Sequence, residues 1–115
     1  MLSLPPSVRV FVCTLPTDMR RSFDGLAAMA KDVVRGDPFS GHLFVFRNRN
    51  RDKMKVLFWD RGGFCQWYKR LEEGTFTLPE SEGDSVEIDA ADLALVLDGA
   101  ELSCAPPRAR FAPRR

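Results

Sequence analysis

The sequence predicts an α/β fold of the α+β kind: a small, mostly antiparallel sheet built around one β-hairpin, with two to three helices and a disordered basic C-terminal tail. Two aromatic-rich apolar runs flank a cation-rich connection in residues 42–60, which is typical of a hairpin. A helical stripe of apolar residues precedes them, and a Pro- and Arg-rich segment closes the chain. We expect one globular domain over residues 1–102 and the disordered tail over residues 103–115.

The central hairpin is predicted from Leu43–Phe46 and Met54–Trp59, two runs of aromatic and β-branched residues that suit a buried, pleated surface. Between them, Asn48–Asp52 has the composition of a turn, because Asn and Asp side chains bond nearby backbone and tolerate left-handed angles. Cations recur at every second position from Arg47 to Lys55, and residues at period two share a face of an extended chain. The turn must break this alternation, so we expect the cations to gather at one end of the hairpin.

Ahead of the hairpin, the pattern predicts a strand and then a helix. Residues 8–13 alternate loosely and indicate a short strand, after a loop with two consecutive prolines. One apolar stripe then recurs at i, i+3, i+4, i+7, i+10 and i+11: Phe23, Leu26, Ala27, Ala30, Val33 and Val34. The candidate caps and stop signals are Thr17, Asp18, Ser22, Gly36 and Asp37–Pro38. Because Gly25 costs roughly 1 kcal/mol relative to Ala inside a helix, we expect either a close backbone approach there or a later helix start.

Residues 64–73, after a turn at Arg61–Gly63, fit two structures. Helical spacing fits Phe64, Trp67, Tyr68 and Leu71. A strand would place chemically mixed side chains on one face, so we prefer the helix and keep the strand as the alternative. Further along we expect two short strands, a helix and its cap: Thr75–Leu78, Val86–Ile88, Ala90–Asp98 and Asp89.

The composition is that of an ordinary globular domain, because 44% of the residues are hydrophobic and 29% are charged. No apolar run approaches the roughly 20 residues needed to span a bilayer, and residues 1–10 lack a signal-peptide pattern, so we expect a cytoplasmic protein without membrane contact. Three widely spaced cysteines and one histidine do not form a zinc-site pattern, and we expect buried free thiols. We therefore expect no metal, no other cofactor and no small-molecule substrate.

The net charge of +1 conceals a strong segregation along the chain. Residues 42–71 hold eight Lys or Arg and two Asp or Glu, a balance of +6. Residues 72–104 hold ten Asp or Glu and no Lys or Arg, a balance of −10. Such blocks predict a molecule with strong fields of both signs. The alternative is that the two blocks pair with each other in the fold.

Motifs for catalysis are missing from the sequence. It has no glycine-rich phosphate loop, no Gly-x-Ser-x-Gly and no His-x-Glu, and one histidine is a poor basis for acid–base chemistry. Asp18, Asp24 and Asp60 could converge on a magnesium ion, as a nuclease needs. Capping and ion pairing are the more common uses of such carboxylates. We therefore predict a protein that is not an enzyme, and we keep the metal-dependent nuclease as an alternative.

The remaining chemistry is that of binding. Arg and Lys side chains neutralise phosphates, and aromatic rings offer faces on which bases stack. We predict that eight cations contact DNA: Arg47, Arg49, Arg51, Lys53, Lys55, Arg61, Lys69 and Arg70. Aromatic residues interleave with these cations, although such rings commonly belong to the core. We assign no catalytic or metal-binding residue.

Four segments carry a family resemblance: LPPSVRVFVCTLPTDMR, TDMRRSFDGLAAM, DPFSGHLFVFRNRNRDKMKVLFWDRGGFCQWYKRLEEGTF and VEIDAADLALVLDGAEL. They span residues 4–102, and the central ones are long and unusual. They resemble the small accessory protein, often called TnpB, of the insertion sequence 66 family of bacterial transposable elements, which is distinct from the RNA-guided nucleases of the same name. The resemblance implies a protein that is encoded beside a larger transposase and is needed for efficient transposition. It implies no catalytic residues.

The residues and the resemblance together predict a transposition accessory factor without catalysis of its own. The basic hairpin, with Lys69 and Arg70, would contact DNA at the ends of the element. The acidic C-terminal helix would contact the cognate transposase or another partner. The alternative is a protein–protein adaptor of the transposase that never touches DNA, whose cations pair with its own acidic half or with a partner.

Overall fold

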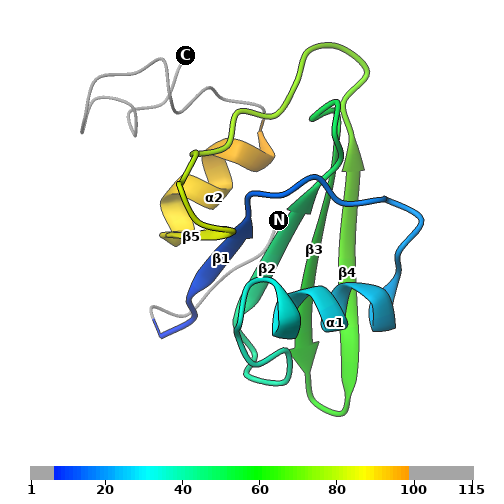
Figure 1. Cartoon of the computed structure of the whole chain (residues 1–115), viewed down its shortest axis with the longest axis vertical. Coiled ribbons are helices and arrows are strands. Elements are labelled where there is room, and N and C mark those ends of the chain that lie inside the picture. Colours follow the sequence, from blue (N-terminus) through cyan, green and yellow to red (C-terminus); the bar gives the residue numbers. More distant parts are fainter. Residues whose placement is uncertain (1–6, 99–115) are drawn as a thin grey trace.

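The computed structural model describes residues 7–98, which form a five-stranded sheet with one helix packed on each face (Figure 1). The strand order across the sheet is β4-β3-β2-β1-β5. Along the chain the elements are β1 (Val10–Cys13), α1 (Phe23–Asp32), β2 (Leu43–Arg47), β3 (Lys53–Asp60), β4 (Gly63–Arg70), β5 (Ser85–Ile88) and α2 (Ala90–Leu97). The predicted α+β class is confirmed. The tail predicted at residues 103–115 lies outside the described residues.

The sheet is antiparallel except at one pair. β1 and β2 run parallel, joined by the crossover that contains α1, and the other neighbouring strands are antiparallel. The predicted hairpin is β2–β3, with Val45 opposite Val56. A second hairpin joins β3 to β4 through a turn in which Arg61 and Gly62 have positive φ, 41° and 90°. β5 pairs with β1, so β4 and β5 are the two edges of the sheet.

The sheet divides the apolar core into two clusters, because successive residues of a strand face opposite sides. The cluster under α2 includes Val45, Met54, Val56, Leu93 and Val96. The cluster under α1 includes Phe44, Phe46, Leu57, Leu26 and Ala30. All of these side chains are fully buried or nearly so. Truncating a buried Leu or Phe of this kind to Ala typically costs about 2–5 kcal/mol, so both faces of the sheet stabilise the fold.

The helix predicted for residues 64–73 is wrong, because this segment forms the edge strand β4. It pairs with β3 along its whole length, from Lys53 opposite Arg70 to Asp60 opposite Gly63. The mixed chemistry that argued against a strand is tolerated here because most β4 side chains are only half-buried. The pairing with β3 and the partial burial therefore outweigh the helical spacing of the aromatic residues.

The short strand predicted at Thr75–Leu78 is also wrong. The backbone there is irregular, and Phe76 and Leu78 are buried in the cluster under α2. The Phe76 N–H donates to the carbonyl of Arg51 at 2.6 Å, outside any strand ladder. The apolar pattern therefore reflected burial of this segment and not its pairing in the sheet.

The first predicted helix is present within tighter limits. α1 begins at Phe23, and its N-cap side chain makes no capping hydrogen bond. The later helix start expected from Gly25 is therefore observed, and a close approach accompanies it, because a Cβ atom at Gly25 would stand 3.1 Å from the Arg21 Cβ. Gly36 lies beyond the helix end, where a Cβ atom would stand 2.7 Å from the Phe44 ring. Glycine at that position lets the chain pass close over the core before it enters β2.

The C-terminal elements agree closely with expectation. Residues 86–88 lie in β5, and the Asp89 side chain accepts a hydrogen bond from the Asp92 N–H, as an N-cap does. Neither of the helices in residues 7–98 is long and apolar enough to cross a membrane. Cys13 is a buried free thiol, as predicted, and Cys65 is a half-buried one. The third cysteine lies outside the described residues.

Candidate nucleic-acid interface

The tip of the β2–β3 hairpin is held rigidly by one side chain. Asn48 Oδ1 accepts hydrogen bonds from the Asp52 and Lys53 N–H groups at 3.1 and 3.0 Å, and Asn48 Nδ2 donates to Asp52 Oδ1 at 2.6 Å. Arg51 closes the turn with a left-handed φ of 60° and donates its N–H to the Asn48 carbonyl. The turn chemistry predicted from Asn and Asp is therefore used in full, although an Arg occupies the left-handed position.

The same tip is anchored from outside the hairpin. The Leu71 N–H donates to the Asp52 carbonyl at 2.7 Å, and the segment after β4 thereby holds the tip on one side. The Thr17 N–H donates to the Arg47 carbonyl at 2.8 Å, and the segment after β1 thereby holds β2 just before the tip. Side chains on this tip are consequently presented by a fixed backbone, which suits a binding site.

An open groove of about 550 Å³ runs between the hairpin tip and residues 16–20. The polar and aromatic side chains that line it are three cations, one carboxylate, two amides and one aromatic ring: Arg20, Arg49, Lys53, Asp18, Asn48, Asn50 and Tyr68. Arg49 is exposed and Lys53 is half-buried. Within residues 7–98, neither of these two side chains makes a hydrogen bond or an ion pair. Among the residues that the structure describes, no carboxylate pairs with Arg49 or Lys53, so the groove presents positive charge at these two positions.

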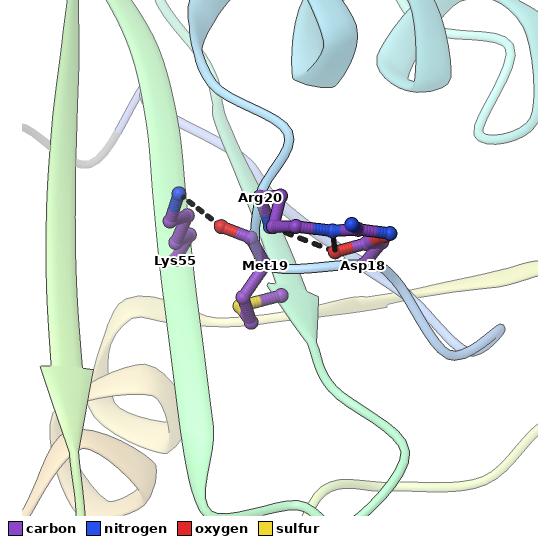
Figure 2. Close-up of polar contacts among 4 residues, drawn as sticks. All are labelled: Asp18, Met19, Arg20 and Lys55. Carbon is purple, nitrogen blue, oxygen red and sulfur yellow. Dashed lines mark hydrogen bonds and ion pairs between the residues drawn. The ribbon is translucent and has the colours of Figure 1, made fainter.

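Lys55 does not reach this groove, because its ammonium holds the groove wall in place (Figure 2). Only 5% of the residue is exposed. Its Nζ donates to the carbonyls of Met19 and Arg21 at 2.7 and 2.8 Å, and it lies 4.8 Å from the centre of the Tyr68 ring. Lys55 thus ties the segment before α1 to the sheet.

Arg20 carries its own counter-ion in the groove. Figure 2 shows its guanidinium lying along the Asp18 carboxylate, with Nη2 2.7 Å from Oδ2. Hydrogen bonds from the Arg20 side chain, and then from its backbone N–H, lower the pKa of Asp18 to about 2. The Arg20 side chain is nevertheless 92% exposed, so it remains accessible to a phosphate that competes with Asp18.

Arg47 and Arg51 face the opposite side of the tip. They line a second hollow of about 240 Å³ together with the acidic loop of residues 80–84. Arg47 is half-buried and donates to the Thr14 carbonyl. Burial, and then the positive charge of Arg51, lower the pKa of Arg47. The acidic loop therefore shares its space with these two cations and not with Arg49 and Lys53.

The other three predicted cations do not line the groove, and each lies beside a partner of its own. Arg61 Nε is 3.9 Å from an Asp60 oxygen, Lys69 Nζ donates to the Leu97 carbonyl at 2.7 Å, and Arg70 Nε is 3.1 Å from a Glu72 oxygen. The structure thus brings together two of the eight predicted cations, Arg49 and Lys53, and adds Arg20 to them. Sequence reasoning missed Arg20, because it lies far from the hairpin in the chain and no local motif marks it.

The carboxylates of the nuclease alternative do not form a metal site. Asp18 pairs with Arg20, Asp24 lies in the first turn of α1, and Asp60 ends β3 beside Arg61. Within the described part of the chain, no three His, Cys, Asp or Glu side chains gather closely enough to hold a metal ion. The arrangement therefore gives no support to magnesium-dependent cleavage.

A family model described as "IS66 Orf2 like protein" matches residues 8–106. The chain belongs to this family. An IS66 Orf2-like protein is an accessory protein of transposition, so the predicted family and its transposition-associated role are both confirmed.

Two relatives of this IS66 Orf2-like protein come from Sinorhizobium fredii. "Uncharacterized protein y4hO" is 40% identical over 99 residues, which cover 86% of each chain. "Uncharacterized protein y4jC" is 30% identical over 99 residues, which cover 86% of this chain and 85% of the relative. No solved structure matches the chain significantly.

Proposed function

We propose that this protein assists transposition in the cytoplasm by binding DNA phosphates in the groove between the hairpin tip and residues 16–20, without catalysis of its own. The observation that carries this proposal is the convergence of Arg20, Arg49 and Lys53, from two segments far apart in the chain, on one open groove. The side chains of Arg49 and Lys53 make no hydrogen bond or ion pair within residues 7–98, and the acidic loop lies on the other side of the tip, beside Arg47 and Arg51. A polyanion is the ligand that satisfies such a surface.

The rigidity of the tip supports the same proposal. Hydrogen bonds from Asn48 and from the backbone of residues 71 and 76 already fix the turn. Binding therefore loses little conformational entropy in ordering it. The Arg49 guanidinium can then contact a phosphate through two of its N–H groups, and the Lys53 ammonium can act as a point charge beside it. DNA at the element ends is the partner we propose for this groove.

A matched pair of variants tests the proposal. Arg49→Ala removes a cation from the groove, whereas Arg51→Gly removes one from the opposite side of the same tip and keeps the left-handed turn. Gel-shift titrations with an element-end duplex should give a several-fold weaker affinity for Arg49→Ala and nearly unchanged affinity for Arg51→Gly. Equal affinities for the two variants and the wild type would refute the groove as the DNA-binding site.

A second candidate function is that of a transposase adaptor, which a different observation favours. Arg47 and Arg51 already face the loop that contains Glu80, Glu82 and Asp84, so part of the basic hairpin is balanced within the molecule. The exposed acidic residues of that loop and the Asp89 end of α2 would then offer a negative surface to a positive partner. A pull-down of the cognate transposase, with and without element-end DNA, separates the two functions. Recovery that is independent of DNA favours the adaptor, and recovery only with DNA favours the groove.

A further inference from the structure

We propose that the groove accepts unpaired nucleotides, with Tyr68 as the platform on which a base stacks and with the groove cations as phosphate contacts. This inference rests on the proposed function, because Arg20, Arg49 and Lys53 serve in both. It goes further by naming the form of the ligand, single-stranded DNA, and the residue that selects it. Stacking on an aromatic ring requires a base whose face is free, which a base inside an intact duplex does not offer.

The exposure of Tyr68 is the first observation. Tyr68 lies on β4 opposite Lys55, on the face of the sheet that carries α1, and 49% of it is exposed. The Lys55 ammonium stands 4.8 Å from the ring centre on one side. An aromatic ring held in this way has a fixed orientation, and its remaining surface lines the groove. The position therefore has the properties of a stacking platform and not of a core residue.

The neighbouring aromatic residues make the contrast clear. Trp59 and Phe64, on the same two strands, pack against each other with ring centres 5.0 Å apart, and Phe39 packs against both of them. Within the described residues, Tyr68 has no aromatic neighbour of this kind, and its one ring contact is the Lys55 ammonium. A base would supply the missing stacking partner.

The groove also supplies what a nucleotide backbone needs around that ring. Arg49 and Lys53 extend from the hairpin side, and Arg20 extends from the facing wall, so that phosphates on either side of a stacked base meet a cation. The exposed Asn50 amide lines the same groove and can both donate to and accept from a base edge. The groove thus combines an aromatic ring for the base, cations for the flanking phosphates and an amide for the base edge.

The groove has room for a nucleotide beside Tyr68. Its volume of about 550 Å³ lies in the range of sites that enclose small organic ligands, about 300–1,000 Å³, which suits one or two nucleotides. It is lined by residues 16–20, by the hairpin residues Asn48, Arg49, Asn50 and Lys53, and by Tyr68 of β4. A base inside a duplex is stacked on both faces, so a duplex can contact Arg20 and Arg49 through its phosphates but offers no base face to Tyr68.

The experiment exploits the fact that Tyr68 is the single tyrosine of the chain. Protein labelled with 3-fluorotyrosine gives one ¹⁹F resonance, which we expect to shift when a 12-nucleotide single strand is added and to stay in place with the matching duplex. Fluorescence anisotropy should show single-strand binding about 5- to 150-fold weaker for Tyr68→Leu than for the wild type, with duplex binding unchanged. Tyr68→Phe keeps the ring and should bind the single strand as the wild type does.

The outcomes that overturn the inference are distinct from those that overturn the proposed function. An unshifted ¹⁹F resonance with the single strand, or equal single-strand affinities for Tyr68→Leu and the wild type, refutes the stacking platform. Equal weakening of single-strand and duplex binding by Tyr68→Leu also refutes it, because a structural role would do the same. If duplex binding still depends on Arg49 in these cases, the proposed function survives. Absence of binding to either DNA form refutes both.

Discussion

Replacing Lys55 with Met would remove the ammonium that ties residues 19–21 to the sheet while keeping most of the aliphatic side chain. The Lys55 Nζ makes two hydrogen bonds, to the Met19 and Arg21 carbonyls, and residue 55 is only 5% exposed. A hydrogen bond to a charged group contributes about 1.5–3 kcal/mol, so losing both should lower the free energy of unfolding by at least about 3 kcal/mol. A domain of this size should then melt roughly 10–20 °C lower.

Urea and thermal unfolding, followed by circular dichroism, measure this change. Lys31→Met is the matched control, because Lys31 lies exposed in the last turn of α1 and its loss should change stability by less than about 0.5 kcal/mol. The Lys55→Met variant should also bind DNA more weakly, because Arg20 lies on the segment that Lys55 holds. An unfolding free energy for Lys55→Met within about 0.5 kcal/mol of the wild type would show that this anchor is not what fixes the groove wall.

Three further predictions follow from single contacts. Arg51→Gly should stabilise the protein by about 1 kcal/mol in urea unfolding, because φ is 60° at this position and glycine adopts that angle without steric penalty; equal or lower stability would contradict the reasoning. Asp18→Asn should raise DNA affinity at neutral pH, since it frees Arg20. The folded-state pKa of Asp18, about 2, lies below its ordinary value of 3.8, so the ionised carboxylate stabilises the fold above about pH 4 and this contribution is lost between pH 4 and pH 2. Acid titrations of unfolding should therefore show a loss of stability between pH 4 and pH 2 that is smaller for Asp18→Asn than for the wild type. The Cys13 thiol, whose pKa is raised by burial, should resist alkylation in the native protein at pH 7.5 and react after unfolding, as measured by mass spectrometry.

The hairpin could be predicted from the sequence because everything that specifies it is local. The apolar runs that became β2 and β3 flank a turn whose Asn48 and Asp52 bond each other directly. The helix α1 was predictable for the same reason, since its stripe of apolar residues needs no information from elsewhere in the chain. Local chemistry therefore sufficed for the parts of the fold that form from neighbouring residues.

The errors arose where distant residues decide the outcome. β4 has helical aromatic spacing, but eight consecutive pairings with β3 make it a strand. Lys55 belongs to a regular row of cations in the sequence, yet its ammonium is buried and donates to two backbone carbonyls from the segment before α1. Arg20 joins the groove because the β1–α1–β2 crossover carries residues 16–20 beside the hairpin tip. None of these contacts can be predicted from the sequence next to the residue concerned.

The charge pattern is an intermediate case. The sequence predicted a basic block and an acidic block, and it left open whether they pair. The structure divides the basic hairpin: Arg47 and Arg51 face the acidic loop, whereas Arg49 and Lys53 face the groove. Because Lys or Arg occupies every second position from residue 47 to residue 55, many cations gather at the tip. For Arg47 and Lys53 the side follows from the strand register: Arg47 lies opposite Met54, whose side chain packs under α2, and Lys53, one residue before Met54, faces the other side.

The salt dependence of DNA affinity tests the central claim most directly. Three phosphate contacts, at Arg20, Arg49 and Lys53, predict that log affinity falls with log salt concentration at a slope of about −2.7. Arg49→Ala should reduce the slope to about −1.8, and Arg51→Gly should leave it near −2.7. A slope near zero for the wild type, or the same slope for Arg49→Ala as for the wild type, would contradict the assignment of DNA phosphates to this groove.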